Sequence, residues 1–353
     1  MASSSLQGLL SLIALCFIAF AVIIMLRAWD VQLPFLSGLQ QGNNSYSTYQ
    51  TVSTISPNGT APNGQLYAYA LSLINKDRNA FGLQNVTLSS ESSGQQHSDS
   101  MLRYGYFSHW DTYGMKPYMR YTLLGGRGAV SENIAYEEQA YRACIIVCYT
   151  KGSINYTKAL YDMEYSMMYN DSACCNNGHR NNILDPNHNQ VAIGIAYNSS
   201  TIYFTEDFID NYINWDSGSP SSAGGKVSLR GNVQNGYRLS GVEIGYDAPA
   251  SNMTVGQLSS TKSYSYGNTV AGVVRSSLEY YQNIKTIVAG SYMVNGNGFS
   301  ISFDMGDVMR QYGAGEYTVE VWLNNTSTGS GFIGSTYTIF IDSSGNEYQP
   351  TNV

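Results

Sequence analysis

Four segments between His97 and Phe208 read His97-Ser-Asp-Ser-Met101 with Tyr106-Phe-Ser-His109-Trp-Asp111, Ser131-Glu132-Asn133-Ile134-Ala135, Gly178-His179-Arg180-Asn181-Asn182-Ile183-Leu184 and Tyr203-Phe204-Thr205-Glu206-Asp207-Phe208. The chain has four histidines, and this window holds all of them: His97, His109, His179 and His188. Histidine titrates near neutrality and is the commonest metal ligand. The window is therefore where a functional site is expected.

Hydrophobic periodicity around this window predicts helices first and a β-hairpin last. Apolar residues recur at spacings of three and four from Leu66 to Ile74, which indicates a helix that ends near Gly82. A second helix is expected from the Ser89-Ser90-Glu91 cluster to Gly105. The runs 191–197 and 201–205 flank a three-residue turn and predict the hairpin.

The sequence changes character beyond residue 212. Residues 213–225 include Asp216-Ser-Gly-Ser-Pro-Ser-Ser-Ala-Gly-Gly225 and are predicted to be a linker. Residues 226–343 are expected to form a β-sandwich of immunoglobulin-like type, because they contain short β-branched and aromatic runs bounded by Gly, Asn and Ser. Those runs are 227–233, 242–246, 286–294, 299–303, 317–323 and 336–341. The tyrosines at 264, 266, 280 and 281 are interpreted either as edge and loop aromatics or as a ligand platform.

Composition excludes some partners and favours export. The net charge is −7 with 18 Lys and Arg residues in 353, so no basic patch argues for nucleic acid. Asn-x-Ser/Thr sequons suggest a glycosylated exterior. They begin at Asn43, Asn58, Asn85, Asn155, Asn170, Asn198, Asn252, Asn324 and Asn325.

The N-terminus agrees with export. Residues 8–26 carry no charge, and about 19 helical residues span about 28 Å, close to the thickness of a hydrocarbon core. Residues 6–27 are predicted to be a transmembrane anchor or a signal sequence, and residues 28–64 a flexible stalk. The expected location is the cell membrane, single-pass with an extracellular body; the alternative is a secreted protein.

Cysteine spacing predicts disulfides beside the third segment. Adjacent cysteines rarely bridge one another, so Cys144 and Cys148 are expected to pair with Cys174 and Cys175. The alternative is a structural zinc site of four thiolates, but the spacing is not the usual repeated C-x2-C. Two such bridges would fix the loop that carries His179.

In combination, these segments resemble the CAP superfamily, the cysteine-rich secretory, antigen 5 and pathogenesis-related proteins. The resemblance starts at Leu71-Ser-Leu-Ile-Asn75-Lys-Asp-Arg78 and covers residues 65–212. It implies an α+β fold: a CAP-type α-β-α sandwich, followed here by the all-β immunoglobulin-like sandwich and preceded by one transmembrane helix.

The resemblance also implies a cleft with two histidines and two acids. His109 and His179 match the family's histidine segments, Glu132 matches its Glu-Asn motif, and Glu164 is assigned as the second acid. His97 is given a packing or rim role. Such a set is capable of holding a divalent metal such as Zn²⁺ through His109, His179 and Glu132, with Glu132 and Glu164 as catalytic acids. The competing interpretation is that His109 and Glu132 pair to fix the fold.

Two classes of function follow. The first is a membrane-anchored extracellular protein that binds a lipid, glycan or protein ligand in the His/Glu cleft. The second is an extracellular metal-dependent hydrolase or peptidase. The sequence contains no Gly-x-Ser-x-Gly elbow and no His-Glu-x-x-His motif, so no reaction is assigned.

Overall fold

The computed structural model describes residues 63–139 and 154–350. The expected anchor at 6–27, nearly all of the expected stalk, and both Cys144 and Cys148 lie outside these ranges. Within them, none of the helices combines the length and the apolar content that a membrane crossing requires.

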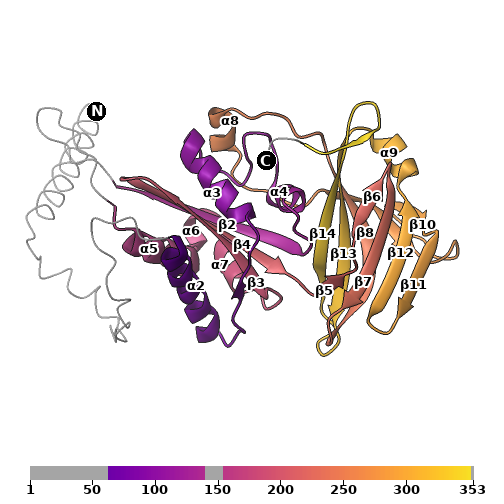
Figure 1. Ribbon diagram of the computed structural model, residues 1–353, viewed down its shortest axis with the longest axis horizontal. Helices are drawn as coiled ribbons and strands as arrows, with labels where there is room; N and C mark the ends of the chain where they lie inside the picture. The colour runs from indigo at the N-terminus through magenta and orange to yellow at the C-terminus, as the bar shows by residue number, and fades with distance from the viewer. Residues whose placement is uncertain (1–62, 140–153, 351–353) are drawn as a thin grey trace, which may run out of the picture. The chain divides into compact units, whose positions relative to one another are not determined.

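The first part of the described chain is a sheet with helices on both faces (Figure 1). The sheet has the order β1-β3-β4-β2, with β1 parallel to β3 and the other pairs antiparallel. Its elements are α2 (Asn63–Ala80), β1 (Thr87–Leu88), α3 (Ser93–Tyr104), α4 (Pro117–Leu123), β2 (Ala129–Glu138), α5 (Tyr156–Tyr169), α6 (Ser172–Cys175), α7 (Gly178–Ile183), β3 (Gln190–Tyr197) and β4 (Thr201–Asp210).

The predicted helices and the hairpin are confirmed. Helix α2 buries the apolar face that the sequence showed, with Leu66 and Ile74 fully covered. Helix α3 ends where Gly105 adopts the left-handed conformation, φ 68°, which a glycine takes without steric cost. Strands β3 and β4 pair over the expected turn.

Glycines allow α3 to lie directly on the sheet. A Cβ at Gly194 of β3 would come within 2.0 Å of the backbone oxygen of Gly94, and a Cβ at Gly94 within 2.8 Å of Ala192 O. No side chain fits between the two backbones there. This close approach places the N-terminal turn of α3 against the centre of the sheet.

Strand β2 distributes the site over both faces of the sheet. Successive side chains of a strand point to opposite faces. Glu132 therefore faces α3 and α4, whereas Asn133 faces α5 and α7, as their hydrogen bonds show. Since β2 ends the sheet order, both sets of side chains lie along one edge.

The second part of the described chain is built from two sheets. One has the order β10-β9-β8-β13-β14-β15 and the other β11-β12-β7-β5, with β6 paired to β7. The strands are β5 (Ile213–Trp215), β6 (Ser221–Ala223), β7 (Lys226–Val233), β8 (Tyr237–Asp247), β9 (Asn268–Val274), β10 (Lys285–Val288), β11 (Ser291–Asn295), β12 (Gly298–Asp304), β13 (Gly315–Asn325), β14 (Gly331–Ile341) and β15 (Glu347–Tyr348); the helices are α8 (Val255–Ser260) and α9 (Gly306–Tyr312).

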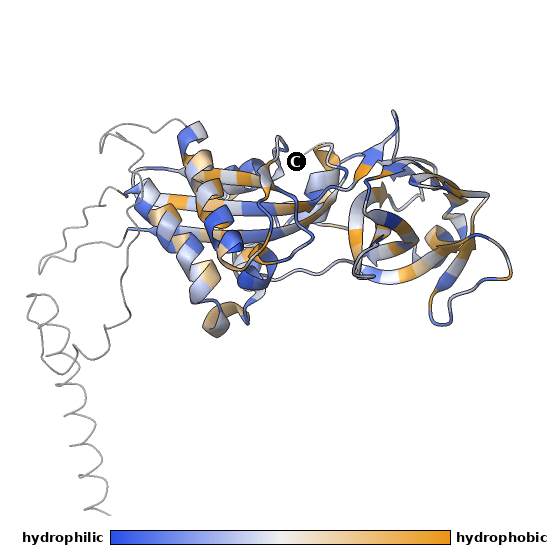
Figure 2. Cartoon of the chain, turned by 90° about the horizontal axis from the view of Figure 1, so that it is seen from below, coloured by the Kyte–Doolittle hydropathy of each residue, from blue (hydrophilic) through white to orange (hydrophobic). Residues whose placement is uncertain are grey.

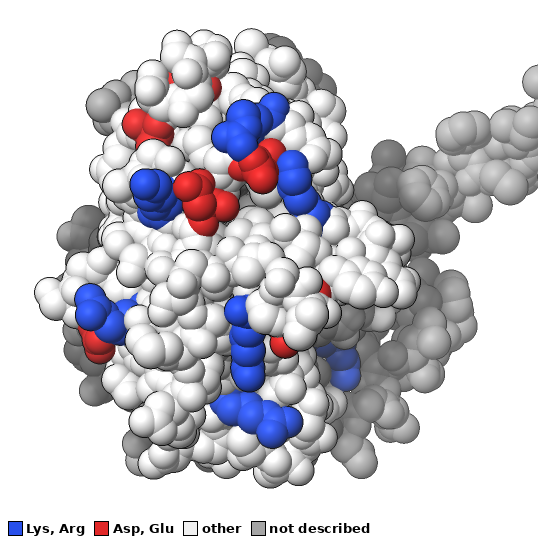
Figure 3. Space-filling model, turned by 90° about the vertical axis from the view of Figure 1, so that its right-hand side faces the viewer, with Lys and Arg blue, Asp and Glu red and all other residues white. Residues whose placement is uncertain are grey.

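Alternating side chains of these strands fill one hydrophobic core. Along β7 buried and exposed residues alternate without exception, and hydrophobic and hydrophilic positions also alternate along strands in Figure 2. Tyr317, Val319 and Val321 of β13 are buried in this core, as the pattern predicted. Seen from the right-hand side of Figure 1, the outer surface is largely uncharged, with both signs interspersed (Figure 3).

The structure corrects three expectations for this part. Residues 213–225 are not a free linker, because β5 and β6 lie within them and both pair with β7. The predicted strand at 286–294 is two strands, β10 and β11, in different sheets. Strand β9 was missed. The immunoglobulin-like type of the sandwich stays a prediction.

The two parts pack against each other. Strand β14 contacts α4 and β2, so the polar face of the neighbouring strand β13 is also covered. Thr318 and Glu320 on that face are buried. The segment from Met253 to Tyr266 also lies along the first part, through hydrogen bonds that reach residues 108–132.

Candidate functional site

A buried, hydrogen-bonded triad lies on the α3/α4 face of β2. Nδ1 of His109 is 2.9 Å from Oε1 of Glu132, and a guanidinium nitrogen of Arg120 donates to Oε2 at 2.8 Å. Arg120 also donates to the backbone oxygens of His109 and Met115. Both carboxylate oxygens of Glu132 are thus occupied, and its side chain is fully buried.

Burial sets the protonation of this triad. It raises the pKa of Glu132 to about 7 against the opposing charge of Arg120, and it lowers the pKa of His109 to about 4 with help from Arg120. His109 is therefore a neutral imidazole at physiological pH. Because Nδ1 is held by Glu132, Nε2 is the nitrogen that remains for a ligand.

Two further buried groups support the triad. His97 donates from Nε2 to the backbone oxygen of Ser108 at 2.8 Å, which fixes the loop that leads to His109. Asp207 lies opposite Glu132 in the β2–β4 register and accepts a hydrogen bond from Ser93. Burial and the charge of Glu132 raise the pKa of Asp207 well above its ordinary value.

The second histidine has its own carboxylate. Nδ1 of His179 is 2.6 Å from Oδ1 of Asp171, and the backbone N–H of Arg180 donates to the other oxygen at 3.1 Å. The backbone oxygen of His179 accepts from Asn133 of β2. As in His109, Nδ1 of His179 is held by a carboxylate, which leaves Nε2 for a ligand. The side chain of His179 is 18% exposed.

Within the described residues, Cys174 is bonded to its neighbour Cys175, and their Cα atoms are 3.8 Å apart. Cys144 and Cys148 lie outside the described residues, so the expected pairing of these two with Cys174 and Cys175 stays a prediction.

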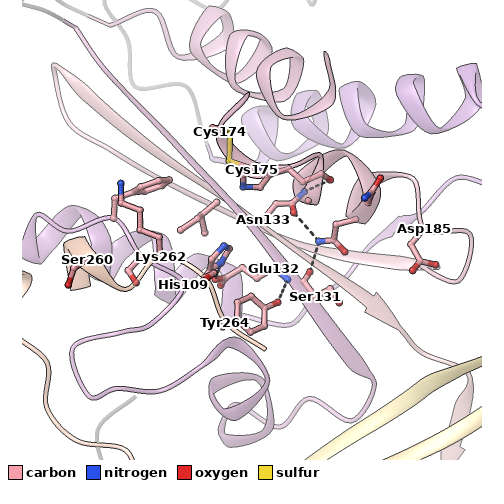
Figure 4. A pocket seen from close by; sticks show the side chains of 18 residues that line it. His109, Ser131, Glu132, Asn133, Cys174, Cys175, Asp185, Ser260, Lys262 and Tyr264 are labelled. Atoms are coloured by element: carbon pink, nitrogen blue, oxygen red, sulfur yellow. Dashed lines mark hydrogen bonds and ion pairs between the residues drawn. A yellow bond between two sulfur atoms is a disulfide. The ribbon is translucent and has the colours of Figure 1, made fainter. Parts of the chain in front are cut away.

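Both histidines border one cavity of about 760 Å³. In Figure 4, Cys174 and Cys175 lie on one side of the strand that carries Glu132, and His109 and Tyr264 lie on the other. The lining residues are Phe107, Ser108, His109, Ser131, Glu132, Asn133, Ile134, Cys174, Cys175, Gly178, His179, Asn181, Asn182, Asp185, Ser260, Lys262, Ser263 and Tyr264.

One wall of this cleft comes from the C-terminal part. The hydroxyl oxygen of Tyr264 accepts the backbone N–H of Glu132 at 2.8 Å, and its ring packs against His109 with centroids 5.0 Å apart. Tyr266 donates to the backbone oxygen of Val130 at 2.7 Å. Two tyrosines therefore provide hydrogen-bond partners for backbone groups at the edge of β2. The same segment places Lys262 at the rim of the cleft.

Glu164 lies elsewhere. It borders a separate cavity of about 170 Å³ with Leu73, Asp77 and Tyr169. It is buried beside Glu206, and burial together with the charge of Glu206 raises its pKa well above the ordinary value. Because Glu164 lines a different cavity from His109, it is not placed to act as the second acid of the His109 cleft.

A comparison with known families assigns the first part. Residues 71–208 match the family model of CAP, the Cysteine-rich secretory protein family. Residues 71–208 form a CAP domain. The resemblance seen in the sequence is thereby confirmed for this part of the chain.

Two solved structures that contain such a domain also match. An extracellular protein containing an SCP domain from Bacillus anthracis str. Ames is 18% identical, with a TM-score of 0.31 over 43% of this chain and 45% of that one. The CAP domain of Enterococcal PrgA is 15% identical, with a TM-score of 0.27 over 41% and 60%. The matched region thus spans less than two thirds of either chain. Among curated proteins none matches.

The CAP domain brings His109, Glu132 and His179 to one cleft but gives them unequal roles. Glu132 orients His109, and Asp171 does the same for His179. Imidazoles held by carboxylates in this way are typical of metal ligands, so each ring is oriented as such ligands are. Each oxygen of Glu132 already interacts with Arg120 or His109, and its assignment as a third ligand stays a prediction.

The sequence interpretation missed Arg120, Asp171 and Tyr264. Asp171 lies eight residues before His179 with no periodic relation to it. Tyr264 is 132 residues from Glu132. His188, the fourth histidine of the window, is held by Asp210 and Asn182 at 2.7 and 2.9 Å.

Proposed function

We propose that this protein binds a ligand outside the cell, in the cleft between its CAP domain and the segment 260–264. In this proposal residues 6–27 anchor it to the membrane and the ligand is a lipid, a glycan or a protein segment. The observation that carries the proposal is the shared cavity of about 760 Å³, bordered by both oriented histidines and closed by the C-terminal part.

The lining supports recognition of a ligand with polar and apolar groups. Amides and hydroxyls of Asn181, Ser131 and Ser263 offer hydrogen bonds, while Phe107 and Ile134 offer apolar surface. Lys262 adds a cation at the rim. Sites for small ligands combine these two kinds of lining, with a few polar groups that set orientation.

In this proposal a divalent ion bound in the same cleft is a component of binding. His109 and His179 would hold it through Nε2, with Glu132 and Asp171 as the orienting carboxylates. When bound, the ion would supply Lewis acidity toward an oxygen of the ligand.

Binding is favoured over hydrolysis by the state of the candidate base. The side chain of Glu132 is fully buried and both of its oxygens are already engaged by Arg120 and His109, which disfavours a role in activating water. In the described residues, neither His109 nor His179 is hydrogen-bonded to a hydroxyl or thiol nucleophile. Hydrolysis remains the alternative outcome of the test.

The test is an inventory of metals and small molecules that co-purify with the full chain, followed by titration of Zn²⁺ alone by calorimetry. Replacing both His109 and His179 by Ala is expected to abolish tight binding, whereas His188→Ala leaves it unchanged. Equal Zn²⁺ affinity of the double variant and the parent would remove the metal component, and Glu132-dependent hydrolysis would establish the enzyme instead.

A further inference from the structure

The turn between α6 and α7 gathers four side chains with metal-ligand chemistry. Asn176 and Asn177 both adopt the left-handed conformation, with φ of 51° and 62°. This reverses the chain after Cys175 and returns His179 to Asp171, at the start of α6. A residue pair separated by eight positions is thereby brought into hydrogen-bond contact.

The four side chains lie close enough together to reach one ion. Ligand atoms of Asp171, Cys174, Cys175 and His179 all lie within 4.8 Å of one another, and no other group of three or more His, Cys, Asp or Glu in residues 63–139 and 154–350 does so. Sγ of Cys174 is 3.7 Å from Oδ1 of Asp171. Tetrahedral zinc bonds of about 2.0–2.3 Å place ligand atoms roughly 3.3–3.8 Å apart.

The group is also accessible. Cys174 is exposed and Cys175 is half-buried, and both border the large cleft with His179. Asp171 is buried and is oriented by the backbone N–H of Arg180. An ion therefore has an open path to a site whose deepest ligand is already fixed.

We propose that reduction of the Cys174–Cys175 disulfide converts this turn into a tetrahedral site for a soft divalent ion such as Zn²⁺. Asp171, Cys174, Cys175 and His179 are its four ligands. A dithiol reductant breaks the S–S bond by exchange: it gives two electrons and two protons and leaves as its own disulfide. Binding then releases both thiol protons to solvent, and two thiolates and a carboxylate face the cation.

This site differs from the one in the proposed function. The two share His179, so one ion at a time occupies that imidazole. His109 serves the cleft and not the turn, whereas Asp171 and the cysteines supply ligands to the turn. Loss of binding in a His109 variant and loss in a cysteine variant therefore report on separate proposals.

The experiment uses the full chain with Cys16, Cys144 and Cys148 replaced by Ser, so that no other thiol binds the probe. Protein reduced by a phosphine, which takes up oxygen from water, is desalted without oxygen and titrated with Zn²⁺ against a chromophoric chelator. One equivalent is expected to bind tightly and to be lost on reoxidation. Cys174→Ser and Cys175→Ser should each weaken binding by at least about 100-fold, and Asp171→Asn by about 10-fold or more.

Matched variants make the result decisive. His109→Ala should retain the reduced-state site, and Co²⁺ in place of Zn²⁺ should show thiolate-to-metal charge-transfer absorption. Equal Zn²⁺ affinity of the reduced and oxidised protein overturns the proposal. So does peptide mapping of the unreduced parent that finds Cys174 or Cys175 bridged to Cys144 or Cys148. The same mapping covers the case in which the triple-Ser background fails to fold.

Discussion

At the scale of single residues, the chemistry of the cleft depends on which ring nitrogen of each histidine is not bonded to a carboxylate. Glu132 and Asp171 each hold an Nδ1, and both rings keep Nε2 for a ligand. The two carboxylates thus orient the histidine rings. In this protein an acid that the sequence marks as catalytic is a structural partner of the histidine beside it.

The pKa shifts of His109 and Glu132 nearly cancel in their effect on stability. Between pH 6.5 and 4.5 the folded pair carries its proton on Glu132, whose pKa is raised from 4.5 to about 7. The unfolded chain carries the proton on His109, whose folded pKa is lowered from 6.5 to about 4. Proton counts match, so the pair contributes little pH dependence to stability in that window.

Glu132→Gln should expose the contribution of His109 alone. A lowered folded pKa gives stability that is present above pH 6.5 and is lost as pH falls toward 4. The free energy of unfolding of the variant should therefore fall, relative to the parent, by about 3 kcal/mol from pH 7 to pH 4. Urea unfolding at each pH measures this, with the exposed Glu138→Gln as control. Parallel pH curves for parent and variant would contradict it.

Replacing Arg78 should strongly reduce stability. It is fully buried and donates to the backbone oxygens of Gln84, Ile183, Asp185 and His188. Arg78→Met leaves these acceptors without a partner, which should cost about 3 kcal/mol in the free energy of unfolding. The exposed Arg103→Met is the control, expected to stay within about 0.5 kcal/mol. Equal losses in the free energy of unfolding in both variants would contradict a stabilising role for the buried hydrogen bonds of Arg78.

At the scale of elements, hydrophobic periodicity and the glycines at element ends predicted the helices and strands that local interactions determine. Helix α2 followed from its apolar face, α3 from the glycine after it, and β13 from its alternation. Strands β5 and β6 were taken for linker because edge strands of Ser, Asn and Gly have the composition of a loop. Their pairing with β7 depends on a partner strand, which composition does not reveal.

Site residues divide in the same way. His109, Glu132 and His179 stand in motifs and were predicted. Arg120 reaches the site from the neighbouring helix α4, and Asp171 reaches it through the turn between α6 and α7, so neither has a motif of its own. Tyr264 had no local signal, because its contact with Glu132 exists only when the second part folds onto the first. Contacts of this kind are set by tertiary packing.

The segment that carries Tyr264 should stabilise the edge of β2. Tyr264→Phe removes the oxygen that accepts the Glu132 N–H, so a half-buried donor loses its partner. The expected loss is about 1–2 kcal/mol in the free energy of unfolding, with a changed amide shift of Glu132 by NMR. Tyr280→Phe, 74% exposed, is the matched control. An unmoved Glu132 amide would contradict this contact.

At the scale of the whole molecule, the two parts of the described chain, within residues 63–139 and 154–350, belong to one compact unit. The outer face of β13 shows why. Glu320 and Glu316 are buried there, and burial raises the pKa of each to about 7. A sheet face that carries carboxyl groups would be solvated if the second part stood alone. Its burial reflects contact with the CAP domain.

Limited proteolysis tests this directly. A true linker at 213–225 would be cut first and release two folded pieces. Because β5 and β6 pair with β7, and because β14 packs on α4 and β2, that segment should resist a broad-specificity protease while the protein is folded. The same protease in urea should cut there, which shows that the peptide itself is cleavable. Two stable fragments meeting within 213–225 under native conditions would mean that the parts are held together more weakly than their hydrogen bonds and buried carboxyl groups require.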